Sequence, residues 1–204
     1  MSFRVTGFRD EAKVLLDNMA NMHLKDIESL TLQNGKVVTP AEPIDWYPDG
    51  LAWKTNLSRT EVRKFPQLAG FHQWMVAEAE AGHITRQELV SMIPTLLLDV
   101  KSHHAVLDMC AAPGSKTSQI IEALHVDAAE GEVPKGFCVA NDANNARCYM
   151  LVHQVNIHSH CITTCRCSFS CDRLISGKTI EQSLLCCRQS RRSRHAQNEN
   201  RICW

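Results

Sequence analysis

The first 100 residues alternate strand-like and helix-like patterns of apolar positions. Phe3 and Val5 alternate with polar neighbours, which predicts a half-buried strand. A helix is predicted next by apolar residues at helical spacing, namely Ala12, Leu15, Leu16 and Met19. A Gly- and Pro-rich stretch over residues 34–49 predicts strand and loop. We therefore divide this part into an N-terminal α/β segment, residues 1–52, and a helical linker region, residues 53–100.

Two capping boxes predict helix starts in the linker region. They pair Ser58 with Glu61 and Thr85 with Glu88. Between them, a stripe of aromatic and other apolar residues recurs at helical spacing and consists of Phe71, Trp74, Met75 and Ala79. Such a stripe is typical of core packing, and we favour that interpretation over a ligand-binding role.

Residues 101–156 change to a strand–helix–strand–helix pattern. Two short apolar runs, at residues 105–107 and 137–140, are each followed by a helical pattern, at residues 115–125 and 143–155. Continuously apolar strands separated by helices predict an α/β domain with a parallel sheet covered on both faces. The sequence therefore predicts a small α+β and helical N-terminal region followed by the first part of a parallel α/β domain.

Charge and cysteine content change near Asn156. The chain has no net charge, but residues 1–156 hold 14 basic and 19 acidic residues, whereas residues 157–204 hold 8 and 3. Seven of the ten cysteines also follow Asn156. We expect residues 157–204 to be a Cys- and Arg-rich tail that is disordered or encoded out of frame. The absence of a signal-like or membrane-length apolar segment predicts a soluble intracellular protein with reduced thiols.

The tail offers two other interpretations. Its cysteines at 161, 165, 167 and 171 lie near two histidines, but they are closer together than in standard zinc sites, so we expect no metal. Its arginines can bind RNA phosphates without sequence specificity. We favour an inert, disordered tail over both.

The segment Leu107–Thr117, LDMCAAPGSKT, lies between a predicted buried strand and a predicted helix. In open α/β sheets, ligands bind beyond the carboxyl ends of the strands. Gly114 permits unusual backbone dihedrals, the amides opening a helix at Ser115 can face an anion, and Lys116 adds positive charge. The glycine patterns of phosphate loops and dinucleotide-binding loops are absent, which disfavours P-loop enzymes and dehydrogenases. The alternative is a turn of small residues that serves packing alone.

Two aspartates accompany this loop. Asp142 follows the second predicted strand, where an acidic side chain can accept hydrogen bonds from ribose hydroxyls. Its alternative role is to cap the helix that follows. Asp108, directly before the loop, can bind a ligand ammonium or can brace the loop.

The segment Asp108–Thr117 resembles the cofactor motif of the Nop/Sun-domain RNA (cytosine-5) methyltransferases. Further segments resemble the eukaryotic tRNA-modifying branch of that family: residues 46–48, 51–53, 55–59, 71–73, 91–94 and 139–142. The resemblance covers residues 3–154. It implies a Rossmann-like methyltransferase core over residues 101–156, preceded by an RNA-binding segment.

The resemblance also implies function. It predicts S-adenosyl-L-methionine as methyl donor, cytosine in tRNA or another RNA as acceptor, a nuclear location and no membrane association. Asp142 would bind the cofactor ribose. The remaining cofactor contacts would come from Cys110, Ala111, Ala112, Pro113, Gly114, Ser115 and Lys116.

The catalytic cysteines of the family have no counterpart in this sequence. The family uses one cysteine in an Asp-x-Pro-Cys motif and one in a Thr-Cys-Ser motif, and neither motif is present. Cys110 corresponds to a cofactor-loop residue and not to a nucleophile. We therefore expect a methyltransferase chain that is truncated before its catalytic cysteines and contains no catalytic residue. The alternative is a non-catalytic fragment that binds cofactor or RNA.

Overall fold

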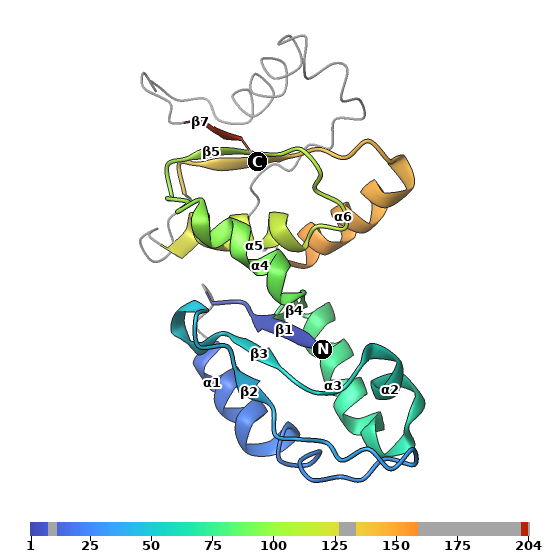
Figure 1. Cartoon of the computed structure of the whole chain (residues 1–204). Coiled ribbons are helices and arrows are strands. Elements are labelled where there is room, and N and C mark those ends of the chain that lie inside the picture. The colour runs from blue at the N-terminus through green and yellow to red at the C-terminus, as the bar shows by residue number, and fades with distance from the viewer. Residues whose placement is uncertain (8–11, 127–133, 159–200, 204) are drawn as a thin grey trace. The chain divides into compact units, whose positions relative to one another are not determined.

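The computed structural model describes residues 1–7, 12–126, 134–158 and 201–203. The chain folds into two compact units, Met1–Met92 and Ile93–Trp204. Figure 1 shows a sheet with helices in the first unit and a second sheet with its own helices in the other.

The first unit is built on a four-stranded sheet with the strand order β2-β3-β1-β4. All neighbouring strands in it are antiparallel. In the central strand, Phe3 pairs with Trp53 of β3 on one side and with Arg86 of β4 on the other. The strands are β1 (Ser2–Val5), β2 (Glu42–Pro43), β3 (Ala52–Lys54) and β4 (Ile84–Arg86).

Helices supply the rest of the first core. Helix α1 contacts β1, and α3 contacts β4 and α2. The buried core joins Phe3 and Val5 of the sheet to Met19, Leu68 and Phe71 of the helical segments. The helical elements are α1 (Ala12–Asn18), η1 (Met19–His23), η2 (Pro48–Gly50), α2 (Arg59–Lys64), η3 (Pro66–Leu68) and α3 (Ala69–Glu80).

One of the two predicted capping boxes is confirmed. Glu61 N donates to Ser58 Oγ over 3.2 Å, and Ser58 N donates to Glu61 Oε2 over 2.7 Å. The box at Thr85 is wrong, because Thr85 is a buried residue of β4 that pairs with Arg4 of β1. The following helix, α4 (Leu89–Leu97), begins only after Glu88.

The aromatic stripe of α3 serves mainly the core, as its spacing predicts. Phe71 and Met75 are buried in the first core, and Trp74 packs against its edge. The Trp74 ring stacks on His23 with the ring centroids 4.6 Å apart. The stripe therefore ties η1 to α3.

The first unit extends across the boundary at residue 52 that the sequence suggested. Strand β4 lies in the expected linker region and β3 crosses its boundary, yet the two strands pair with β1, one on each side. Residues 1–92 therefore form one unit, and the division between units falls inside α4, between Met92 and Ile93.

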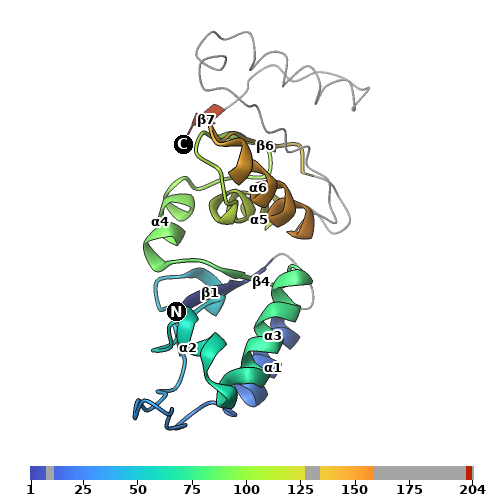
Figure 2. The ribbon, with the colours of Figure 1, turned by 90° about the vertical axis from the view of Figure 1, so that its right-hand side faces the viewer.

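The second unit contains the predicted parallel sheet. Strand β5 (Ala105–Asp108) pairs in parallel with β6 (Phe137–Ala140) and with β7 (Arg201–Cys203), which gives the order β6-β5-β7. Helices α5 (Ser115–Val126) and α6 (Asn145–His158) follow β5 and β6. Figures 1 and 2 show α5 and α6 on the same face of this sheet, so the expected covering of both faces is not seen among the described residues.

The second core lies between the sheet and these two helices. Val106 and Cys138 from the strands pack with Ile120, Leu124 and Leu151 from the helices, all nearly inaccessible to solvent. The second unit has the arrangement of a partial Rossmann-like α/β core.

Most of the expected tail lies outside the described residues, including its cysteine cluster at 161–171. Where the tail is described, residues 157–158 end α6 and Arg201–Cys203 form β7. None of the described helices is long and apolar enough to span a membrane.

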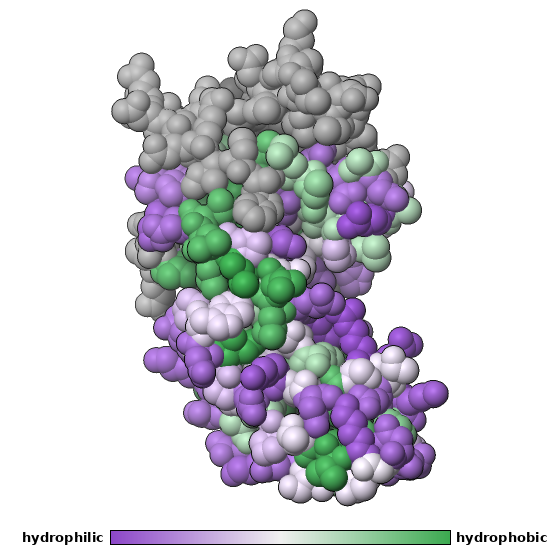
Figure 3. All heavy atoms as spheres, in the orientation of Figure 1, coloured by the Kyte–Doolittle hydropathy of each residue, from purple (hydrophilic) through white to green (hydrophobic). Residues whose placement is uncertain are grey.

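Some apolar surface remains exposed on the described residues. Figure 3 shows apolar atoms on the face turned to the viewer. On α4, Val90 and Leu97 are 71% and 79% exposed, and on α6 Tyr149 is 81% exposed.

Candidate functional site

The candidate site is the loop between β5 and α5, at the carboxyl end of the central parallel strand. Strand β5 ends at Asp108, and α5 begins at Ser115. Ala111 and Ala112 turn into the core and are each 4% exposed, whereas Cys110 is exposed. The small buried residues anchor the loop, and its outer positions remain accessible.

Gly114 has a conformation and surroundings that only glycine fits. Its φ angle is +114°, a region that other residues rarely adopt. A Cβ atom at this position would lie 3.1 Å from Gln154 Cβ and 3.2 Å from Leu151 Cδ1. The close approach of α6 therefore requires glycine just before α5 begins.

Asp108 braces the loop from inside. The carboxylate is buried, Thr117 Oγ1 donates to Oδ2 over 2.7 Å, and Cys110 N donates to Oδ1 over 3.3 Å. Burial raises the pKa of Asp108, and the hydrogen bonds from Thr117 and Cys110 partly oppose that shift. Asp108 thus joins the start of the loop to the first turn of α5, which is the bracing role.

Asp142 connects the end of β6 to the same loop. Ala112 N donates to Asp142 Oδ2 over 3.0 Å, and Asn144 N donates to Oδ1 over 2.9 Å. The second contact closes the turn that leads into α6, which begins at Asn145. The two regions that the sequence singled out therefore meet at adjacent strand ends.

Two residues that the sequence reasoning missed complete this junction. Asn141 N donates to Asp108 O and Asn141 O accepts from Ala111 N, both over 2.8 Å. The Arg147 guanidinium donates to Ala112 O, and its Nη1 lies 3.8 Å from Asp142 Oδ2. Arg147 lies in the first turn of α6, five residues after Asp142, and no local pattern of the sequence indicates its contact with the loop.

The accessible part of the site is small and carries positive charge. Pro113 is exposed, and Ser115 and Lys116 are half-buried at the start of α5. The carboxylate of Asp142 is nearly buried. Within residues 1–7, 12–126, 134–158 and 201–203, no cluster of three or more His, Cys, Asp or Glu side chains could hold a metal ion. The arrangement suits a small ligand with an anionic group and hydroxyls.

Known proteins match this chain in sequence. Residues 95–185 match the family model described as 16S rRNA methyltransferase RsmB/F. A multisite-specific tRNA:(cytosine-C(5))-methyltransferase of Saccharomyces cerevisiae is 48% identical over 76% of this chain. A tRNA (cytosine(34)-C(5))-methyltransferase of Drosophila melanogaster is 46% identical over 79%. The chain spans about a fifth of the length of these curated relatives, 22% of each.

Solved structures share the fold of this chain. A methyltransferase homolog protein from Pyrococcus horikoshii gives a TM-score of 0.54 at 20% identity, covering 87% of this chain and 46% of that one. The structure of NSun6 from the same organism with SFG gives 0.51 at 16% identity, covering 86% and 59%. The motif at the end of β5 agrees with the family model and with the sequence relatives, and the chain belongs to the RsmB/F family of Nop/Sun-domain methyltransferases.

Proposed function

We propose that this chain binds S-adenosyl-L-methionine at residues 110–116 and Asp142, as the cofactor-binding part of an RNA (cytosine-5) methyltransferase acting on tRNA. The hydrogen bond from Ala112 N to Asp142 Oδ2 carries the proposal, because it joins the resemblance-bearing loop to an acidic side chain on the adjacent strand end. The names of the similar yeast and fly proteins supply the substrate class. The resemblance adds a nuclear location.

The residues present fit this cofactor. The amides that open α5 at Ser115, together with Lys116, suit the carboxylate of an amino acid group. Gly114 lets the loop pack closely against α6, and Asp142 can accept hydrogen bonds from ribose hydroxyls. When bound there, the cofactor would supply the methyl group.

The chain's own residues orient and restrain this site. Asp108 fixes the loop relative to α5 through Thr117, so the helix opening keeps its place. Each carboxylate oxygen of Asp142 accepts one backbone N–H, from Ala112 or Asn144, so each would keep a further lone pair for a ribose hydroxyl. Arg147, which donates to Ala112 O, holds the loop beside Asp142.

Methyl transfer to cytosine requires more than this chain holds. The resemblance implies two catalytic cysteines, and the 204-residue sequence contains neither of their motifs. We therefore propose that the chain as given binds the cofactor without turnover.

Isothermal titration of the 204-residue protein with S-adenosyl-L-methionine tests cofactor binding, and transfer of a radioactive methyl group to bulk tRNA tests turnover. We expect saturable binding and no incorporation. Binding of NAD or ATP in place of S-adenosyl-L-methionine would overturn the cofactor assignment. Incorporation into tRNA cytosine would overturn the absence of turnover.

A further inference from the structure

A hollow of about 280 Å³ lies on the first unit, outside the site already described. It is formed where four segments meet: the start of β1, the end of β3, the start of α2 and the start of α4. Its lining consists of Met1, Ser2, Lys54, Thr55, Arg59, Glu88 and Leu89. Its volume is close to the lower end of small-ligand pockets, which suits one nucleotide-sized group.

The hollow holds two opposite charges that are not paired with one another or with another described side chain. Arg59 and Glu88 are exposed, and neither side chain forms a hydrogen bond or an ion pair with any described residue. Lys54 differs, because its Nζ lies 2.9 Å from Glu42 Oε2 on the neighbouring strand. An unpaired guanidinium and an unpaired carboxylate that line one hollow can contact different groups of a single ligand.

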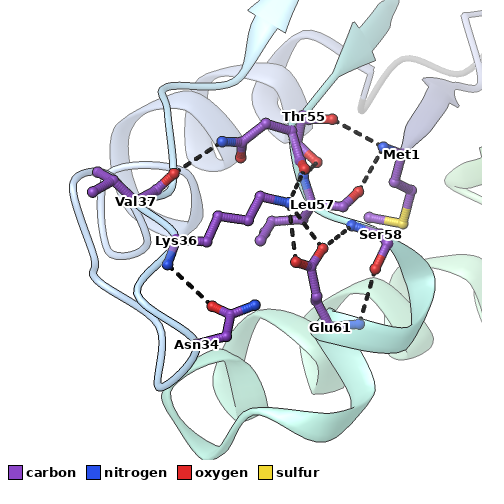
Figure 4. Close-up of polar contacts among 9 residues, drawn as sticks. Met1, Asn34, Lys36, Val37, Thr55, Leu57, Ser58 and Glu61 are labelled. Atoms are coloured by element: carbon purple, nitrogen blue, oxygen red, sulfur yellow. Dashed lines mark hydrogen bonds and ion pairs between the residues drawn. The ribbon is translucent and has the colours of Figure 1, made fainter.

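The wall beside Arg59 is held in place by a polar network, which Figure 4 shows. The Met1 ammonium donates to Thr55 O over 2.9 Å and to Leu57 O over 2.6 Å. The Ser58–Glu61 capping box fixes the first turn of α2, and Lys36 Nζ lies 3.0 Å from Glu61 Oε2. A preformed wall lowers the ordering cost of binding a ligand.

We propose that this hollow binds one nucleotide of single-stranded RNA, with the phosphate at Arg59 and the amino-bearing edge of the base at Glu88. The proposal rests on the proposed function in one respect, that the ligand of this protein is RNA. Guanidinium groups bind phosphate oxygens, and a glutamate accepts from the exocyclic amino group of cytosine. Unstacked bases in single strands expose that edge.

The pairing of charges predicts a base preference. Uracil presents a carbonyl oxygen where cytosine presents an amino group, so Glu88 would repel uracil and attract cytosine. The hollow should therefore bind oligocytidylate more tightly than oligouridylate. A purely electrostatic surface would bind both equally, because the phosphates are the same.

Fluorescence anisotropy of the 204-residue protein with labelled short oligocytidylate and oligouridylate tests the proposal. Arg59→Ala should weaken oligocytidylate binding about tenfold. Its matched control is Arg63→Ala, the same charge loss at an exposed position of the same helix that does not line the hollow. Glu88→Gln should bring the ratio of the two affinities close to one, because a glutamine amide accepts from cytosine and donates to uracil equally well.

The outcomes separate this proposal from the cofactor site. Glu80→Gln, an exposed carboxylate on α3, is the control that should leave the affinity ratio unchanged. Equal weakening by Arg59→Ala and Arg63→Ala, or no oligonucleotide binding by the wild type, would overturn the nucleotide site. The same variants should bind S-adenosyl-L-methionine as tightly as the wild type does. A wild-type protein that does not bind S-adenosyl-L-methionine would count against the proposed function and not against the nucleotide site.

Discussion

The two units of this chain obtain their structure in different ways. In the first unit, β1 pairs antiparallel with β3 and β4, which lie up to about 80 residues away in sequence, and the sheet packs on a core from residues 1–92. In the second, three parallel strands place their carboxyl ends together, and the loop after β5 meets the residue after β6. The antiparallel unit gains a core built from distant segments, whereas the parallel unit places its candidate ligand loop at one edge of the sheet.

The largest expected effect is on the core of the first unit. Phe3 is fully buried at the centre of its sheet, so Phe3→Ala should lower the free energy of unfolding of this unit by about 3–5 kcal/mol. Amide hydrogen exchange should then show lost protection in β1, β3 and β4 and retained protection in β5 and β6. Val14→Ala, at a 60% exposed position of α1, is the control and should change stability by less than about 0.5 kcal/mol. Equal loss of protection in both sheets would show that the units do not unfold separately.

The next largest effect is expected at Gly114, in the loop between β5 and α5. Gly114→Ala should destabilise the second unit by about 1–3 kcal/mol, because alanine is strained at a φ angle of +114°. It should also weaken S-adenosyl-L-methionine binding in the same titration, since the loop and α6 must separate to admit the Cβ. Thermal unfolding measures the first effect.

Gly70→Ala is the matched control for this substitution. Gly70 lies in the first turn of α3 with open space around its Cα, and alanine is a better helix former there by about 0.5–1 kcal/mol. The two substitutions should therefore have opposite signs. A neutral or stabilising Gly114→Ala would show that α6 does not approach residue 114 closely enough to require glycine.

The sequence predicted the parts of both units that local pattern encodes. The Ser58–Glu61 capping box and the strand–loop–helix around Gly114 are formed by neighbours in the chain, and both are present. Thr85 shows where local pattern fails, since a residue suited to a helix cap is used in β4 because its backbone pairs with Arg4. A partner about 80 residues away leaves no periodic signal near Thr85.

The candidate site also contains residues that the local sequence predicts and residues that it does not. The loop and Asp142 could be predicted, because the family-like motif and the strand end are local features. The contacts of Asn141 and Arg147 could not, because they depend on the register that sets Asp108 opposite Ala140. Register between parallel strands is fixed by packing across the whole sheet, and one sequence does not reveal it.

A smaller effect tests Asp142 as a ligand group. Asp142→Asn should weaken S-adenosyl-L-methionine binding about tenfold or more, because hydrogen bonds to a charged group contribute about 1.5–3 kcal/mol. Asp99→Asn is the control, since Asp99 is an exposed partner of Lys101 and asparagine tolerates its φ angle of 45°. Unchanged affinity in Asp142→Asn, measured by isothermal titration, would leave Asp142 with a structural role only, in the contact with Ala112 and the turn before α6.

The smallest expected effect concerns two carboxylates with opposite pKa shifts, one in each unit. The hydrogen bonds from Ser58 and Lys36 lower the pKa of Glu61 to about 2, whereas burial raises the pKa of Asp108 above its ordinary value. The folded state thus holds Glu61 ionised, and its stabilisation is present above about pH 4.5 and is lost as the pH falls toward 2. For Asp108 the sign reverses: its protonated form favours folding below its ordinary pKa of 3.8, and this contribution is lost as the pH rises through the raised value.

Acid should therefore destabilise the first unit, where Glu61 becomes protonated. In the second unit, protonation of Asp108 should favour the folded state. Urea unfolding followed by tryptophan fluorescence reports mainly on the first unit, which holds Trp46, Trp53 and Trp74. Glu61→Gln should lower stability by about 1 kcal/mol at neutral pH and should flatten the dependence between pH 4.5 and 2, because the screened ion pair and the cap are both small terms. Glu80→Gln should leave the curve unchanged. If the stability of Glu61→Gln still falls as steeply as that of the wild type between pH 4.5 and 2, other carboxylates of the first unit cause the fall. The opposite pKa shifts of Glu61 and Asp108 would then not explain a difference between the units.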